Sequence, residues 1–146
     1  MMLDWLFVAP LAVGTPAPDF ELMDEQGHAV RLADFRGRKS VVLVWYPGDE
    51  TKICTKQLCE FKDAWADVDR LDTVVFGING QDAASHQKFK QRFAFPFPLL
   101  VDPGQRVGKV YQTYGWIVRR TVYRIDKEGI IRFAQRGKPT PAEVLA

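Results

Sequence analysis

The chain has 146 residues, 47% of them hydrophobic and 12% aromatic, which is enough apolar material for one compact domain over residues 1–146. Twenty basic residues balance 18 acidic ones, and the mixed charges argue against nucleic acid as a partner. Two cysteines and two histidines are too few and too scattered for a structural zinc site, and no metal or other cofactor is expected.

Residues 1–13 are expected to form an apolar N-terminal arm. No Lys or Arg precedes the apolar run, Asp4 stands where a positive flank is needed, and Pro10 interrupts it, so neither a secretory signal nor a membrane helix is expected. We expect Trp5 to Val8 to pack on the domain as a short strand or arm. The expected location is the cytoplasm, where thiols are kept reduced.

The domain itself begins with a hairpin followed by a buried strand. Short strands are predicted over residues 20–22 and 28–32 with Gly27 in the turn, and a single helical turn over 32–35. Residues 40–46, SVVLVWY, lack polar alternation, which is typical of a strand covered on both faces of a mostly parallel sheet. Apolar residues at three- and four-residue spacing predict a helix over 51–68.

The rest of the chain alternates strands and helices. The predicted elements are a strand at 73–78, a helix at 82–93, a strand at 99–101, a short helix at 105–111, strands at 117–125 and 130–135 joined by a turn at 126–129, and a helix at 139–145. This order is compatible with an α/β, thioredoxin-like fold: a central mixed sheet flanked by helices, with an N-terminal hairpin extension. Composition alone leaves other α/β folds open.

The stretch from Tyr46 to Cys59 carries the chemistry. Cys54 falls near the first turn of the helix that follows the buried strand, where unpaired N–H groups and the helix dipole favour the reactive thiolate. Thr51 is placed to cap this helix, and its hydroxyl could reach the sulfur or an oxygen substrate. The ring of Pro47 could shield the sulfur from water. Peroxide reduction needs such a thiolate, fixed donors and little competing water.

The spacing of Cys54 and Cys59 has a mechanical consequence. Residues five apart on a helix differ by about 140° in direction and about 7.5 Å in rise. A disulfide usually needs Cα atoms less than about 7 Å apart with converging Cβ vectors. An intact helix therefore cannot close this bridge, and the helix must unwind locally on oxidation. A structural disulfide would predict a permanently irregular segment instead, and we favour the redox interpretation.

The pattern P-x-x-x-T-x-x-C, here Pro47, Thr51 and Cys54, resembles the active-site signature of the peroxiredoxins of the AhpC/TSA superfamily. The second cysteine, five residues later, is similar to that of the PrxQ or bacterioferritin comigratory protein branch. Lys52 and Ile53 depart from the Pro-Gly pair frequent in this branch, which concerns the shape of the loop rather than the reacting groups. The resemblance covers nearly the whole chain, including residues 14–20, 32–37, 95–102 and 120–126.

The resemblance implies a thiol peroxidase acting on hydrogen peroxide and organic hydroperoxides. Cys54 would be the peroxidatic cysteine, oxidised to a sulfenic acid, and Cys59 the resolving cysteine of an intramolecular disulfide. Thr51 and Arg120 would hold the thiolate and the peroxide oxygens, and Pro47 would shield the pocket. Thioredoxin or a related dithiol protein would be the reductant.

Arg120 is chosen over Arg119 by its spacing to Asp126. Neighbouring residues on a strand face opposite ways, so only one of the two arginines can point at the site. The internal resolving cysteine makes a monomer plausible, while a dimer stays open.

Two other functions on the same fold are weighed. A thioredoxin-type reductase needs C-x-x-C, whereas four residues separate these cysteines. A redox sensor or disulfide-exchange module without fast peroxidase turnover fits the same residues, and turnover with a reductant would separate it from the peroxidase. A metal-delivery module would need C-x-x-x-C and a partner histidine. His28 is expected on the surface and His86 on a helix face, neither with a catalytic role.

Overall fold

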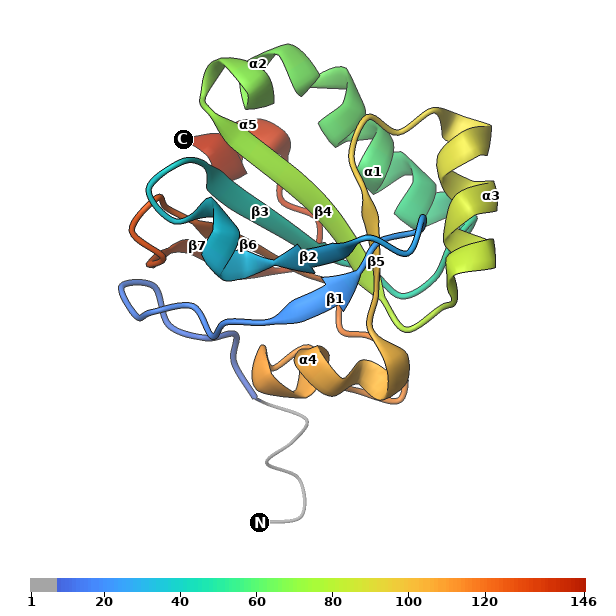
Figure 1. The fold of residues 1–146 in the computed structure, drawn as a ribbon, viewed down its shortest axis with the longest axis horizontal. Coiled ribbons are helices and arrows are strands. Elements are labelled where there is room, and N and C mark those ends of the chain that lie inside the picture. Colours follow the sequence, from blue (N-terminus) through green and yellow to red (C-terminus); the bar gives the residue numbers. More distant parts are fainter. Residues whose placement is uncertain (1–7) are drawn as a thin grey trace.

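The computed structural model describes residues 8–146, and a seven-stranded sheet runs through them (Figure 1). The strands are β1 Glu21–Met23, β2 Ala29–Arg31, β3 Ser40–Trp45, β4 Thr73–Asn79, β5 Leu99–Val101, β6 Thr121–Ile125 and β7 Ile131–Arg136. The helices are α1 Lys52–Asp63, α2 Trp65–Arg70, α3 Ala83–Phe93, α4 Arg106–Val110 and α5 Pro141–Leu145, with 3-10 turns η2 Leu32–Phe35 and η3 Pro103–Gln105.

The sheet is mixed, in the order β2-β1-β5-β4-β3-β6-β7. Strands β3, β4 and β5 run parallel, with α1 and α2 in the first crossover and α3 in the second. The four remaining pairs, β1–β2, β1–β5, β3–β6 and β6–β7, are antiparallel. Two of them, β1–β2 and β6–β7, are hairpins, which need only short turns. The N-terminal hairpin joins the sheet edge beside β5, so the predicted thioredoxin-like arrangement with a hairpin extension is confirmed.

Strand β3 is buried on both faces, as its sequence predicts. Val41, Leu43 and Trp45 belong to one core cluster, to which α4 and the N-terminal hairpin contribute. The alternate residues, among them Val42 and Tyr46, belong to the other cluster, which α1, α2, α3 and α5 cover. Side chains of a strand alternate between faces, so a run without polar residues needs a layer on each side.

Glycines form the turns of the two hairpins, and the described end of the N-terminal arm contacts the domain. Gly27 and Gly129 both adopt positive φ, of 81° and 82°, in the turns of the two hairpins, where glycine avoids the Cβ penalty. Of the expected arm contacts, Trp5, Leu6 and Phe7 lie outside the described residues. The carbonyl of Val8 accepts a hydrogen bond from Arg136 at 2.6 Å.

Two predicted elements differ from the structure. The helix expected over residues 51–68 is divided at Ala64, whose φ and ψ of −90° and 13° end α1 before α2 begins. The strand expected from residue 117 begins only at Thr121. Thr121 pairs with Trp45, the last residue of β3, and beyond it the chain turns away at Pro47. Residues 117–120 therefore have no neighbouring strand to pair with. No helix within residues 8–146 is long and apolar enough to cross a membrane.

Candidate active site

Helix α1 follows the loop that leaves β3 (Figure 1). Cys54 lies in the first turn of this helix. Thr51 is the N-cap residue, and its hydroxyl accepts the Cys54 N–H at 3.4 Å and donates to the Gly48 carbonyl at 3.3 Å. The sulfur-bearing residue is only 1% exposed. Unpaired N–H groups at the start of the helix surround this position with partial positive charge.

Arg120 brings a full positive charge to the same sulfur. One guanidinium nitrogen donates to the Cys54 Sγ at 3.2 Å, and another donates to the Gln57 Oε1 at 2.7 Å. The Gln57 amide in turn donates to the Gly137 carbonyl at 3.4 Å. The guanidinium is therefore fixed at two points, and such charge-assisted hydrogen bonds are stronger than neutral ones.

Arg120 is thus the arginine that contacts the sulfur. Arg119 instead lines a separate surface groove beside Trp116. The spacing to Asp126 therefore selects the right arginine. The argument that only one arginine can face the site assumed a strand at these positions, whereas both arginines precede β6.

Gln57 is a site residue that the sequence analysis does not predict, although its spacing to Cys54 could have indicated it. It lies three residues after Cys54, so a helix places both on one face. The buried residues of α1 are Cys54, Gln57, Leu58 and Phe61, which is one helical stripe. A polar residue inside a buried stripe needs a partner, and here the partner is Arg120.

Cys59 lies on the same continuous helix but off the buried stripe. Both cysteines are free thiols, and Cys59 is half-buried. Partial burial is the largest influence on Cys59, and it raises the pKa of this thiol above its ordinary value despite the opposing charge of Lys62. Because α1 is regular between the two residues, the geometry expected from the sequence is present: the bridge cannot close until this part of the helix unwinds.

Pro47 lies half-buried in the loop between β3 and α1, two residues before Asp49. The buried Tyr46 precedes it, and burial raises the pKa of the Tyr46 hydroxyl well above its ordinary value, with the charges of Asp49 and Cys54 adding to the shift. His28 is exposed, as expected. His86 lies on a face of α3, as expected, but that face is the buried one: the side chain is completely buried, with its Nδ1 2.6 Å from Asp49 of this loop.

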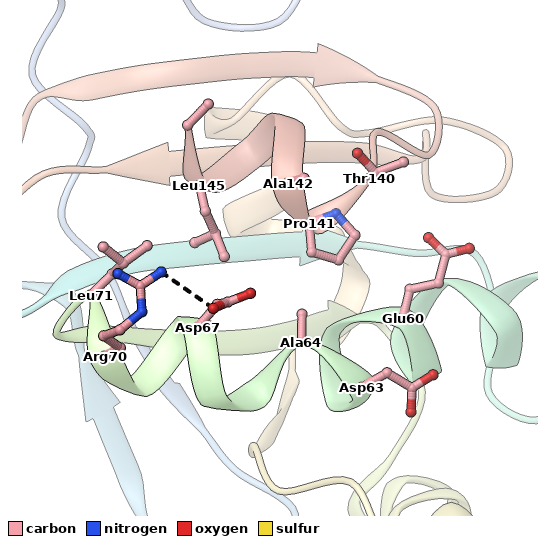
Figure 2. Close-up of a pocket in the computed structure, with 11 residues that line it drawn as sticks. Glu60, Asp63, Ala64, Asp67, Arg70, Leu71, Thr140, Pro141, Ala142 and Leu145 are labelled. Atoms are coloured by element: carbon pink, nitrogen blue, oxygen red, sulfur yellow. Dashed lines mark hydrogen bonds and ion pairs between the residues drawn. The ribbon is translucent and has the colours of Figure 1, made fainter.

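A cavity of about 590 Å³ lies elsewhere, between α2 and α5 (Figure 2). Arg70 and Asp67 form an ion pair at its wall, and Pro141 and Leu145 face them from α5. None of the predicted site residues lines it. Among residues 8–146, no three His, Cys, Asp or Glu side chains gather as ligands for a metal ion.

Comparison with known proteins assigns most of the chain to the family that the active-site motif resembles. The model of the AhpC/TSA family matches residues 13–134. Chloroplastic peroxiredoxin Q of rice (Oryza sativa subsp. japonica) is 40% identical over 132 residues, which are 88% of this chain and 60% of the rice protein. Chloroplastic peroxiredoxin Q of Sedum lineare is 35% identical over 137 residues, 91% of this chain and 73% of that protein. The chain thus spans only 60% of the length of the rice relative.

Solved structures agree on the fold. Peroxidoxin BcpB from Mycobacterium tuberculosis superposes with a TM-score of 0.86 at 26% identity, covering 91% of this chain and 93% of that one. A PrxQ mutant from Xylella fastidiosa has the same TM-score at 22% identity, covering 94% and 95%. With the motif around Cys54, the matched family model and these relatives, the chain belongs to the AhpC/TSA family and is similar to its peroxiredoxin Q members.

Proposed function

We propose that this chain is a thiol peroxidase that reduces hydrogen peroxide and organic hydroperoxides through Cys54. The observation that carries the proposal is the 3.2 Å hydrogen bond from Arg120 to the Cys54 sulfur at the start of α1. A guanidinium and a helix N-terminus together stabilise a thiolate, and the same donors can stabilise the oxyanion that leaves when an O–O bond breaks.

The first step is attack of the Cys54 thiolate on one peroxide oxygen. The S–O bond forms as the O–O bond breaks, the sulfur is oxidised to a sulfenic acid, and the leaving alkoxide or hydroxide takes a proton to become an alcohol or water. Arg120 and Thr51 hold the reacting oxygens, and Pro47 limits the access of water.

The second step joins the two cysteines. After α1 unwinds locally, the Cys59 sulfur attacks the sulfenic sulfur, an S–S bond forms and water leaves. A dithiol protein such as thioredoxin then exchanges with this disulfide, so that both thiols are restored and the partner is oxidised. Partial burial raises the pKa of Cys59, so its thiol in the folded helix does not compete with Cys54 for peroxide; it loses its proton when it attacks the sulfenic sulfur.

The test is to mix reduced protein with one equivalent of hydrogen peroxide and count free thiols from milliseconds to seconds. We expect rapid loss of both thiols, no rapid loss in Cys54→Ser, and arrest at a sulfenic acid in Cys59→Ser. Slow loss in the wild type, or loss that survives Cys54→Ser, would support a redox sensor or a disulfide-exchange module instead.

A matched pair of variants tests the carrying observation. Arg120→Lys keeps the charge but loses the planar fork that reaches both Cys54 and Gln57, and we expect thiol oxidation to slow by roughly 100-fold. Arg119→Lys makes the same chemical change one residue away, and in this variant we expect the thiols to be oxidised at the wild-type rate. Equal effects of the two variants would contradict the assignment.

We further propose that the chain works as a monomer in a reducing compartment such as the cytoplasm. The resolving cysteine on the same helix removes the need for a second subunit, and thiols that are oxidised in each cycle are restored where dithiol reductants are kept reduced. The alternative is a dimer. Its interface would be expected to cover Trp116 and Ile117, which are 99% and 64% exposed in the single chain. Light scattering at several concentrations should give one chain mass, 16.6 kDa, and a mass of about twice this value would contradict the proposal.

A further inference from the structure

Asp49, in the loop between β3 and α1, is the centre of a buried hydrogen-bond network. Its side chain is only 1% exposed. The Tyr46 hydroxyl and the Asn79 amide donate to one carboxylate oxygen at 2.6 and 3.2 Å. The Ser85 hydroxyl donates to the other oxygen at 2.7 Å, and the His86 Nδ1 lies 2.6 Å from it. The carboxylate therefore connects the loop to the ends of β3 and β4 and to α3.

His86 is completely buried, and both of its ring nitrogens face acceptors. Its Nε2 lies 2.9 Å from the Leu100 carbonyl, which can only accept, so this nitrogen carries a proton. Its Nδ1 lies 2.6 Å from the Asp49 carboxylate, which is also an acceptor. Burial by itself would raise the pKa of Asp49, but the hydrogen bonds from His86 and Tyr46 outweigh it, and the pKa is lowered. Asp49 is therefore an acceptor paired with His86.

The loop that this network holds is strained. Glu50, next to Asp49, has a φ of 60°, a conformation that costs energy in a residue with a Cβ and persists only where the surroundings enforce it. Two further contacts hold the loop in this conformation. The backbone N–H of Asp49 donates to the Gln81 side chain, and the Glu50 carboxylate forms an ion pair with Arg92 of α3 at 3.5 Å. Thr51 follows directly and caps α1 at Cys54.

The two steps of the proposed reaction make opposite demands on this region. Attack on peroxide needs Thr51 and the first turn of α1 in place, whereas closure of the disulfide needs that turn to unwind. We propose that Asp49 and His86 are positioning residues that set the balance between the folded, peroxide-reactive form of α1 and the unwound form that closes the disulfide. This inference rests on the proposed function of Cys54 and Cys59.

The pair acts only through the loop, since no hydrogen bond links either residue to Cys54 or Arg120 among those described for residues 8–146. Weakening the pair should therefore move the two steps in opposite directions. Formation of the sulfenic acid should slow, because Thr51 is no longer held against Cys54. Closure of the disulfide should accelerate, because the anchor that opposes unwinding is lost.

The test measures both rates in Asp49→Asn and in the milder His86→Gln by rapid acid quench and mass spectrometry. We expect slower sulfenic acid formation and faster closure, each by about tenfold. The fraction of Cys54 driven to sulfinic acid at high peroxide should fall accordingly, because sulfinic acid forms from sulfenic acid that has not yet closed the disulfide. Ser85→Ala, which removes one donor, provides a third variant should the others fold poorly.

Glu25→Gln is the matched control. Glu25 is also a buried carboxylate; it accepts the Leu99 N–H at 3.1 Å and lies 3.4 Å from Lys90, but it holds the hairpin rather than the loop before α1. We expect it to lower stability while leaving the ratio of the two rates unchanged. The inference is overturned if Glu25→Gln changes the ratio as much as Asp49→Asn, or if both rates fall together. If the wild type itself forms no sulfenic acid, the proposed function fails instead.

Discussion

At the scale of single residues, two cysteines on one helix have different surroundings. Cys54 is buried at the start of α1 with an arginine donating to its sulfur, while Cys59 lies five residues further along, half-buried and without such a donor among the described contacts. The helix terminus and the guanidinium act only on the first sulfur, since such effects fade within a turn. The same residue type thus has two different environments because of its neighbours.

The raised pKa of Cys59 leads to a prediction for its reactivity. Its folded pKa lies above the ordinary value, so the protonated thiol is the form that folding favours, and this contribution to stability is lost as the pH rises through the folded pKa. In a Cys54→Ser variant, alkylation of Cys59 by iodoacetamide should be slow at pH 7 and rise about tenfold per pH unit to beyond pH 8.5. Mass spectrometry would follow the reaction, and a plateau below pH 8 would contradict the prediction.

At the scale of elements, α1 positions the site residues and, in the proposed reaction, has to unwind in part. Its buried stripe of Cys54, Gln57, Leu58 and Phe61 packs on the sheet, and the Thr51 cap starts it. Such a cap contributes about 1 kcal/mol to the stability of a helix, so it holds the first turn only weakly. Segments of a protein can open locally without unfolding of the rest of the domain. The division at Ala64 separates this segment from α2, which packs on β4.

Hydrogen exchange should show this local opening. In the reduced protein, amides of residues 55–59 are protected by the helix. After one equivalent of peroxide they should exchange far faster, because the disulfide cannot form on an intact helix, while amides of β3 and β4 stay protected. Cys59→Ser treated in the same way should keep its protection. Equal protection of the reduced and disulfide forms would show that no unwinding takes place.

At the scale of the whole molecule, the site depends on a sheet packed closely on both faces. Gly77 lies in the middle of β4, where a Cβ would approach Leu99 to 2.8 Å and the Tyr46 ring to 3.0 Å, with Leu58 of α1 next to them. The absence of a side chain at Gly77 lets Tyr46 and α1 lie close against the sheet. The position of the loop before Cys54 is therefore determined by residues distant in sequence.

Overpacking at Gly77 should destabilise the whole fold. We expect Gly77→Ala to lower the free energy of unfolding by about 1–3 kcal/mol, because Leu99 and Tyr46 must shift. Urea denaturation measures the loss. Leu99→Ala in the same chain makes room for the new methyl group, so the double variant should lose less than the sum of the two single losses. Strict additivity would mean that Leu99 does not oppose the added Cβ.

Local patterns were sufficient for most of the elements. The strand at residues 40–46, the cap at Thr51 and the turn that ends at Gly129 are present within a residue or so of their predicted places. Each depends on interactions within one or two turns of chain. The division at Ala64 was not predictable in this way, because alanine is a good helix former and its neighbours follow helical spacing.

The sequence by itself determined which sulfur lies at the start of the helix, since a strand, a cap and a cysteine at the third helical position are all local features. Only the tertiary structure decided what surrounds that sulfur. Arg120 meets Cys54 across 66 positions of the chain, and Asp49 meets His86 across 37. Such contacts depend on how strands pair and helices pack, and the residues that will meet leave no periodic signal in the chain. The motif therefore indicates the chemistry, while the fold supplies the groups that hold it in place.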